Sequence, residues 1–162
     1  LGEMIAQDMV TVRLTAPFNV VIVASPAYVG RHGRPGAVAE LANHNCIGYR
    51  LVRSGAPYRW DLREDGKDVS VETRGTAIVT DSLAAIDLAL AGVGLAYVFE
   101  PLARADLAAG RLVQVLPQST LEEPGLFLYF PRRASLAPKL RAFIDTANEI
   151  GRASLRTPDR VA

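Results

Sequence analysis

Two short segments of this sequence gather the side chains best suited to hold a small polar ligand. Thr80-Asp81-Ser82 offers two hydroxyl groups and a carboxylate, while Arg50, Arg53 and Ser54 stand close together, so that two guanidinium groups can grip a carboxylate. Two further candidates, each after an expected strand, are Ser25 and the pair Phe99-Glu100. Plainer interpretations stay open, because Ser and Asp are common helix caps and exposed arginines are commonly solvated surface charges.

Residues for catalysis are scarce. A Ser–His–Asp arrangement needs a histidine beside the nucleophile, but only His32 and His44 are available and no Gly-x-Ser-x-Gly occurs. Gly92-Val93-Gly94 lacks the third glycine of a dinucleotide-binding loop. Cys46 could join His44 in a metal site only with distant partners, so a buried free thiol is the favoured interpretation. The sequence therefore predicts no enzyme, no cofactor and no metal.

The balance of charge argues against nucleic-acid binding by this chain. Its 18 Lys plus Arg and 17 Asp plus Glu give a net charge of +1, and 49% of its residues are hydrophobic, as in a folded globular protein. No apolar run approaches the ~18 residues of a membrane span, and one cysteine cannot form an internal disulfide. We expect a cytoplasmic protein with no membrane partner. Because Leu1 replaces an initiator Met, we also expect a piece of a longer protein.

Alternating and apolar runs predict the elements that must position these residues. Residues 9–14 alternate as a half-buried strand does, and residues 18–24 are almost wholly apolar and β-branched, which favours a strand covered on both faces. Ser25-Pro26 then predicts a capped helix over 26–31. A second short helix is expected at 37–42, and a strand at 46–50.

The middle of the chain predicts a β-hairpin. Tyr58, Trp60 and Leu62 alternate with charged residues, as do Val69 and Val71 after the turn Asp65-Gly66, which accepts positive φ angles. This alternation assigns the aromatic residues to the hairpin core rather than to a ligand platform.

Strands and helices alternate through the remainder. We expect strands at 76–79, 95–98, 112–116 and 126–130, with a helix from Asp81 to Gly92, one at 101–109 and one at 136–150. The last helix places Leu140, Phe143, Ile144 and Ala147 on one face. Between 117 and 125 we expect a loop. This order is typical of an α/β fold.

Several motifs in fixed order carry a resemblance. Val23-Ala24-Ser25-Pro26-Ala27-Tyr28-Val29 is followed by His32-Gly33-Arg34-Pro35, then by residues 41–47, Trp60 and residues 91–97, and finally by Gly110-Arg111-Leu112-Val113 and residues 128–133. Over about residues 3 to 149 the sequence resembles the effector-binding domain of LysR-type transcription regulators.

That resemblance implies a fold of the type II periplasmic-binding-protein kind, with two lobes around a cleft that holds a small-molecule effector. Its cleft candidates here are Ser25, Arg50, Arg53, Ser54, Thr80, Asp81, Ser82, Phe99 and Glu100. The family also implies a homo-oligomer formed through the effector domain. DNA would be bound only through an N-terminal helix-turn-helix that has no counterpart in this sequence.

The resemblance also implies domain boundaries. Residues 18–131 would be lobe two with the two crossing segments, 18–24 and 127–131, at its ends. Residues 1–17 and 132–150 would be the remnant of an incomplete lobe one, followed by a loose tail at 151–162. The alternative is a periplasmic solute-binding protein of the same fold that serves a transporter, against which stand the free Cys46 and the missing secretion signal.

Overall fold

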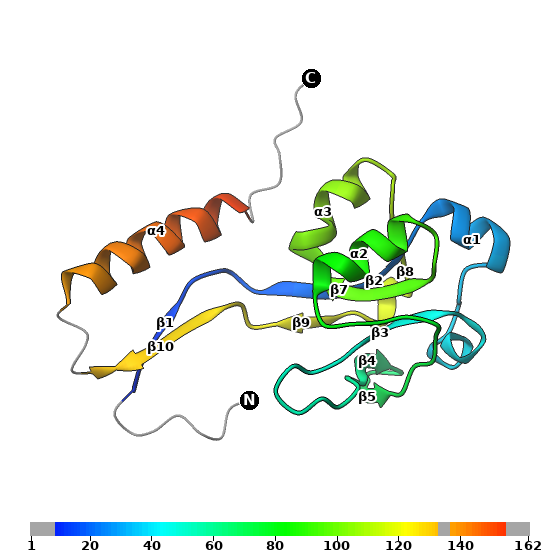
Figure 1. The fold of residues 1–162 in the computed structure, drawn as a ribbon, viewed down its shortest axis with the longest axis horizontal. Helices are drawn as coiled ribbons and strands as arrows, with labels where there is room; N and C mark the ends of the chain where they lie inside the picture. Colours follow the sequence, from blue (N-terminus) through cyan, green and yellow to red (C-terminus); the bar gives the residue numbers. More distant parts are fainter. Residues whose placement is uncertain (1–8, 133–136, 155–162) are drawn as a thin grey trace. The chain divides into compact units, whose positions relative to one another are not determined.

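The computed structural model describes residues 9–132 and 137–154 (Figure 1). It divides into two compact units: Asn19–Glu122, called here the large unit, and the described residues on either side, called the small unit. Each unit is described by itself. No helix among the described residues is long and apolar enough to cross a membrane.

A mixed sheet organises the large unit. Its strand order is β6-β3-β7-β2-β8, with β9 also paired to β2. The strands are β2 (Phe18–Ala24), β3 (Cys46–Tyr49), β6 (Ile78–Val79), β7 (Leu95–Phe99), β8 (Val113–Val115) and β9 (Leu121–Glu123). β3 runs parallel to β6 and β7, whereas β2 runs antiparallel to β7 and β8. The strand β2 is therefore reversed relative to its neighbour, which decides where its flanking residues lie.

Buried side chains cover both faces of this sheet. On β2, Ile22 and Ala24 belong to one hydrophobic cluster while Val21 and Val23 belong to another, as the alternation of a strand requires. The second cluster is completed by α2 (Ser82–Leu90) and α3 (Glu100–Ala108), which lie on the same side of the sheet in Figure 1. β2 is thus buried on both faces, as its apolar sequence predicts.

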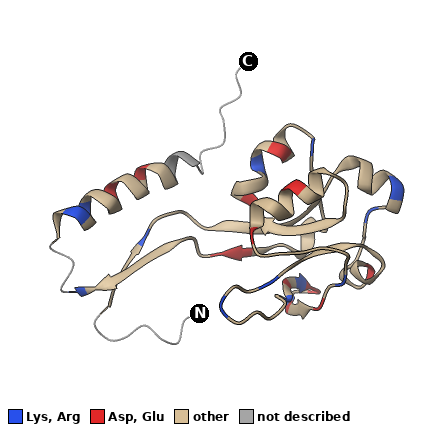
Figure 2. Ribbon diagram, in the orientation of Figure 1, with Lys and Arg blue, Asp and Glu red and all other residues tan. Residues whose placement is uncertain are grey.

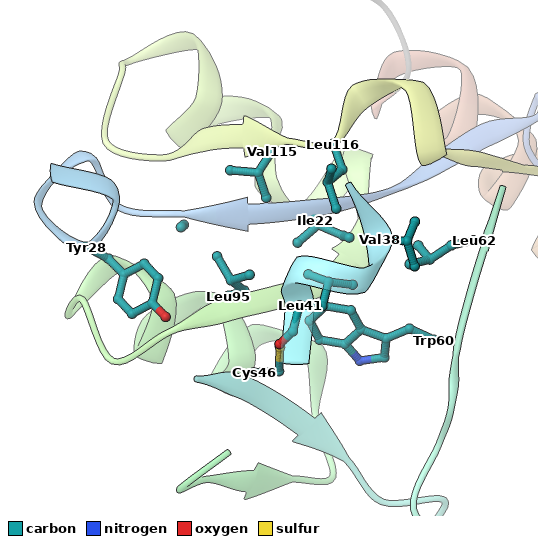
Figure 3. Close-up of a cluster of buried hydrophobic side chains, with 11 residues drawn as sticks. Ile22, Tyr28, Val38, Leu41, Cys46, Trp60, Leu62, Leu95, Val115 and Leu116 are labelled. Atoms are coloured by element: carbon teal, nitrogen blue, oxygen red, sulfur yellow. The ribbon is translucent and has the colours of Figure 1, made fainter. Parts of the chain in front are cut away.

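The opposite face is covered by α1 (Pro26–His32), the 3-10 helix η1 (Val38–Asn43) and a hairpin of β4 (Trp60–Glu64) and β5 (Lys67–Val71). Figure 3 shows their side chains around Leu95 and Ile22. Trp60 is fully buried and stacks on Tyr97 with ring centroids 5.4 Å apart, which confirms its predicted place in the hairpin core. Asp65 and Gly66 both have positive φ at the predicted turn.

The small unit contains β1 (Met9–Arg13), β10 (Phe127–Pro131) and α4 (Pro138–Ser154). β1 and β10 form an antiparallel pair from Met9↔Pro131 to Arg13↔Phe127. Residues 127–131, which the resemblance assigns to a crossing segment, pair with β1 along their whole length. The chain therefore passes from one unit to the other near Phe18 and Glu123, and residues 18–24 are mostly a central strand of the large unit.

Three local expectations differ from the structure. Residues 117–125 contain the short 3-10 helix η2 (Pro117–Ser119) and the strand β9 rather than only a loop. The helix at 37–42 is a 3-10 helix, shifted by one residue. In α4, Leu140, Ile144 and Ala147 are partly buried but Phe143 is 55% exposed, and the helix runs on to Ser154. The expected loose tail lies, from residue 155 on, outside the described residues.

Candidate functional site

Strand direction sorts the predicted site residues into two groups. Because β3, β6 and β7 are parallel, the segments that follow Tyr49, Val79 and Phe99 lie at one edge of the sheet, called here the carboxyl edge. Their other ends form the amino edge. The carboxyl edge gathers eight of the predicted residues: Arg50, Arg53, Ser54, Thr80, Asp81, Ser82, Phe99 and Glu100.

Ser25 lies at the amino edge. The strand β2 runs antiparallel to β7, and the pairing of Val23 with Ala96 places Ser25 beside the start of β7 rather than its end. Its side chain is buried, and its Oγ accepts a hydrogen bond from the Tyr28 backbone N–H at 3.2 Å. The structure therefore gives Ser25 the capping role and separates it from the other candidates.

Asp81 caps helix α2. Its Oδ1 accepts hydrogen bonds from the backbone N–H groups of Leu83 at 2.8 Å and Ala84 at 3.1 Å. These two donors are therefore bonded to the chain itself and are not available to a ligand. Of the neighbouring residues that carry a hydroxyl group, Thr80 is exposed and Ser82 is partly exposed.

Glu100 stands in the first turn of α3 and is paired with Arg104. Two hydrogen bonds join its carboxylate to the guanidinium, at 2.9 and 2.7 Å. The bond to Glu100 also raises the pKa of Arg104. Phe99 precedes the helix and lies opposite Val20 in the β2–β7 pairing. The residue is 40% exposed. This part of the edge therefore has a partly exposed aromatic ring, that of Phe99, next to Glu100, whose charge is balanced by Arg104.

The loop after β3 is tied to β6 at its base. The Arg50 backbone N–H donates to the Val79 carbonyl oxygen at 2.8 Å. Because Val79 precedes Thr80, this bond brings the start of the loop close to Thr80. The Arg50 guanidinium donates to the Gly55 carbonyl oxygen at 2.6 Å, and the Ser54 hydroxyl accepts the Ala56 N–H at 3.3 Å. Arg53 is exposed. In Figure 2 the arginine positions of this loop are coloured blue on the ribbon.

Sequence reasoning missed the apolar side chains at the same edge. The large unit has six exposed large hydrophobic residues. Five lie at the end of β7 or on the segments that follow β3, β6 and β7, namely Leu51, Val52, Leu83, Phe99 and Leu102, and the sixth, Ile78, lies on β6. Of these, the sequence reading selected only Phe99. Leu83 precedes Ile86 and Leu90 at the spacing of one helix face, which predicts that it is buried with them. In the structure Ile86 is buried but Leu83, in the first turn, is 56% exposed.

The amino edge is held by a dense network around Asn45. Its side-chain N–H₂ donates to the Val93 carbonyl at 2.7 Å and to the Thr76 hydroxyl at 3.0 Å, and its side-chain oxygen accepts the Thr76 N–H at 2.8 Å. The Asn45 backbone N–H donates to the Tyr28 hydroxyl at 3.0 Å, which also contacts His44 Nδ1 at 3.2 Å. This edge has no comparable group of exposed apolar side chains in the described part of the chain.

Titratable groups near that network favour their neutral forms. Burial raises the pKa of the Tyr28 hydroxyl, and burial together with the nearby His32 lowers the pKa of His44. Burial raises the pKa of the Cys46 thiol to about 12. Cys46 is a buried free cysteine, as predicted. Within residues 9–132 and 137–154 no group of three or more His, Cys, Asp or Glu side chains is arranged to hold a metal ion.

Comparison with known proteins identifies the class. The model of the LysR substrate binding domain family matches residues 6–151, so the chain belongs to that family. A substrate binding domain-containing protein of Escherichia coli, YagP, is 38% identical over 106 residues, which are 65% of this chain and 78% of that protein. The described fold is accordingly the type II periplasmic-binding-protein fold predicted from the sequence motifs.

Longer relatives are transcription regulators. A putative transcriptional regulator of Pseudomonas aeruginosa is 34% identical over 145 residues, which are 90% of this chain and 47% of that protein. The HTH-type transcriptional regulator PgrR of Escherichia coli is 34% identical over 146 residues, 90% of this chain and 48% of that protein. The chain thus spans about half the length of these curated relatives.

Solved structures agree on the fold. The regulatory domain of CrgA, a LysR-type transcriptional regulator from Neisseria meningitidis, superposes with a TM-score of 0.75 at 23% identity, covering 92% of this chain and 72% of that one. The regulatory domain of AphB from Vibrio vulnificus gives a TM-score of 0.72 at 21% identity, covering 88% of this chain and 70% of that one.

Proposed function

We propose that the chain is the effector-sensing part of a LysR-type DNA-binding transcription regulator, and that a small molecule binds at the carboxyl edge of the large unit. The observation that carries the proposal is the composition of this edge. It combines hydroxyl groups, guanidinium groups and five of the six exposed large hydrophobic side chains of the large unit. Small-molecule sites in proteins typically combine an apolar lining with a few polar groups that orient the ligand.

Chain connectivity supports this choice of edge. The large unit begins at Asn19, and the next residue, Val20, pairs with Phe99 at the end of β7. The connection to the small unit therefore leaves from the carboxyl edge. We propose that the large unit corresponds to lobe two and the small unit to part of lobe one, so that an effector held at this edge can bias the placement of the lobes.

The wider role follows from the relatives. We propose that the intact protein is cytoplasmic, has no enzymatic activity, forms a homo-oligomer through its effector domain and binds DNA through a separate helix-turn-helix. Support comes from the family of the chain and from relatives named as HTH-type regulators. The near-neutral net charge of +1 fits a domain that leaves DNA binding to another part of the protein.

A thermal-shift screen tests the binding proposal. Small metabolites are screened against the chain, since a ligand that binds only the folded state raises its melting temperature. Each compound that does so is repeated with Ser82→Ala and Arg50→Ala, and with Arg31→Ala as the control, because the Arg31 guanidinium donates to the Gly92 carbonyl oxygen at the amino edge. We expect a smaller shift in the two edge variants and an unchanged shift in the control. Equal shifts in all three variants would remove the carboxyl edge from the site.

A further inference from the structure

At the carboxyl edge, the carboxylates of Asp81 and Glu100 have hydrogen-bond partners within the chain, whereas Arg50 and Arg53 have no acidic partner among the ion pairs of the described residues. This difference indicates which ligand charge the edge favours. The two carboxylates among the candidate residues, Asp81 and Glu100, already accept hydrogen bonds from other groups of the chain. Asp81 accepts two backbone N–H groups at the start of α2, where the helix dipole also favours negative charge. Glu100 forms a double hydrogen bond with Arg104. Neither carboxylate is therefore placed to attract a cationic ligand strongly.

The two arginines of the loop after β3 retain their charge. Arg50 donates to the carbonyl oxygen of Gly55, which is a neutral acceptor. Arg53 has an exposed side chain, and none of the ion pairs of the described residues involves either arginine. The loop after β3 therefore carries uncompensated positive charge, while the exposed Glu122 and Glu123 lie on β9, which pairs with β2 and not with β3. A guanidinium group is suited to bind a carboxylate through two parallel hydrogen bonds.

Apolar side chains stand beside these arginines. Val52, which immediately precedes Arg53, is 76% exposed, and Leu83 in the first turn of α2 is 56% exposed. Phe99 and Leu102 add an aromatic ring and a branched side chain at the start of α3. Covering such surface with an apolar group is favourable, by roughly 25 cal/mol per Å² of apolar area removed from water.

We infer that the ligand of the carboxyl edge is an amphipathic carboxylic acid. Its carboxylate is bound by Arg53, with hydroxyl donors at Thr80 and Ser82, and its apolar body lies against Val52, Leu83 and Phe99. This inference rests on the proposed function, because it names the chemical class of the molecule that binds at the same edge. A small hydrophilic anion such as phosphate would contact only the arginine and the hydroxyl groups, because the N–H groups of Leu83 and Ala84 are already bonded to Asp81.

Calorimetric titration of the chain with three probes tests the inference. trans-Cinnamate carries a ring and a carboxylate, cinnamylamine carries the same ring with a positive charge, and acetate carries the carboxylate alone. We expect cinnamate to bind at least about tenfold more tightly than either of the others, because only cinnamate satisfies both the arginine and the apolar surface. Equal or tighter binding of cinnamylamine, or no binding of cinnamate, would overturn the inference.

Variants locate the two halves of the ligand. Arg53→Gln should weaken cinnamate about tenfold by removing a charge-assisted hydrogen bond, and should not weaken cinnamylamine, whose ammonium group gains nothing from the arginine. Leu83→Ser should weaken both ring-bearing probes. Phe143→Ser, at an exposed apolar position of the small unit, is the matched control and should change neither. Unchanged cinnamate binding in Arg53→Gln would refute the assigned role of the arginine.

The two proposals can fail separately. If the metabolite screen finds cationic or uncharged compounds whose thermal shifts depend on Ser82 and Arg50, the carboxyl edge is a binding site but the inferred acid class is wrong. If cinnamate binds and Phe143→Ser alone abolishes its binding, cinnamate binds away from the carboxyl edge, and the proposed site is wrong.

Discussion

The two edges of the central sheet differ in how many of their side chains are hydrogen-bonded or packed within the chain. At the amino edge, Asn45 bridges Thr76 and Val93 through its side chain, and a Cβ added at Gly94 would overlap the Asn45 carbonyl oxygen. At the carboxyl edge, by contrast, arginine, hydroxyl and apolar side chains remain exposed. The same parallel strands thus have one end where side chains are packed and hydrogen-bonded, and another where several side chains are exposed. Binding residues are commonly placed on loops that such a rigid scaffold supports.

The largest effect that we expect at the amino edge concerns Cys46. Burial raises its pKa to about 12, so at pH 8 the thiolate fraction is about 10⁻⁴, and the thiolate is the reactive form. Labelling by Ellman's reagent should therefore be about a thousandfold slower in the native chain than in urea, where the thiol has an ordinary pKa. Rapid stoichiometric labelling of the native chain would show that this edge is open after all.

The next effect concerns close packing. Gly94→Ala introduces a Cβ that overlaps the Asn45 backbone, whereas a Cβ at Gly30 in α1 meets no atom within 4 Å. We expect Gly94→Ala to lower the free energy of unfolding by about 3 kcal/mol, as overpacking commonly does. Gly30→Ala is the control and should be neutral or slightly stabilising, because alanine favours a helix. Urea denaturation measures both. Equal stability of the two variants would contradict the tight packing of the amino edge.

A smaller effect is expected from the cap at the carboxyl edge. Asp81→Ala removes the acceptor of the Leu83 and Ala84 N–H groups and should cost about 1 kcal/mol of unfolding free energy. Asp81→Asn keeps an oxygen acceptor and should recover most of that stability. If Asp81→Asn is as unstable as Asp81→Ala, the negative charge of Asp81, rather than its hydrogen bonds to the helix N–H groups, is what stabilises the fold at this position.

The smallest effect depends on pH. Because burial and His32 lower the pKa of His44 in the folded chain, protonation favours the unfolded state. The contribution of neutral His44 to stability is therefore present above pH 6.5, its ordinary pKa, and is lost as the pH falls through the lower folded pKa. Denaturation of wild type and His44→Gln between pH 5 and 8 should show a weaker pH dependence in the variant. Parallel curves would contradict this role.

Local sequence signals predicted most elements of the fold. The Ser25 cap, the Asp65-Gly66 turn and the Asp81 cap each depend on residues within a few positions, and each occurs as predicted. The strand β9 was missed, since Leu121–Glu123 is three residues long and shows too little alternation to be recognised.

The site was harder to predict because it depends on strand direction. The sequence shows that Ser25 follows a strand, but it does not show that β2 runs antiparallel to β7, which places Ser25 at the opposite edge. The exposed apolar residues were missed for a related reason. Whether Leu83 or Val52 faces the core or solvent depends on how α2 and the loop after β3 pack on the sheet, which no local pattern encodes.

The most direct test of the central claim is amide hydrogen exchange of the chain with and without saturating trans-cinnamate. We predict added protection at residues 50–54, 80–84 and 99–103, with no change at 45–46, 75–76 and 93–95. Protection that appears at the amino edge, or that spares the loop after β3 and the first turns of α2 and α3, would contradict the claim that the carboxyl edge binds the ligand.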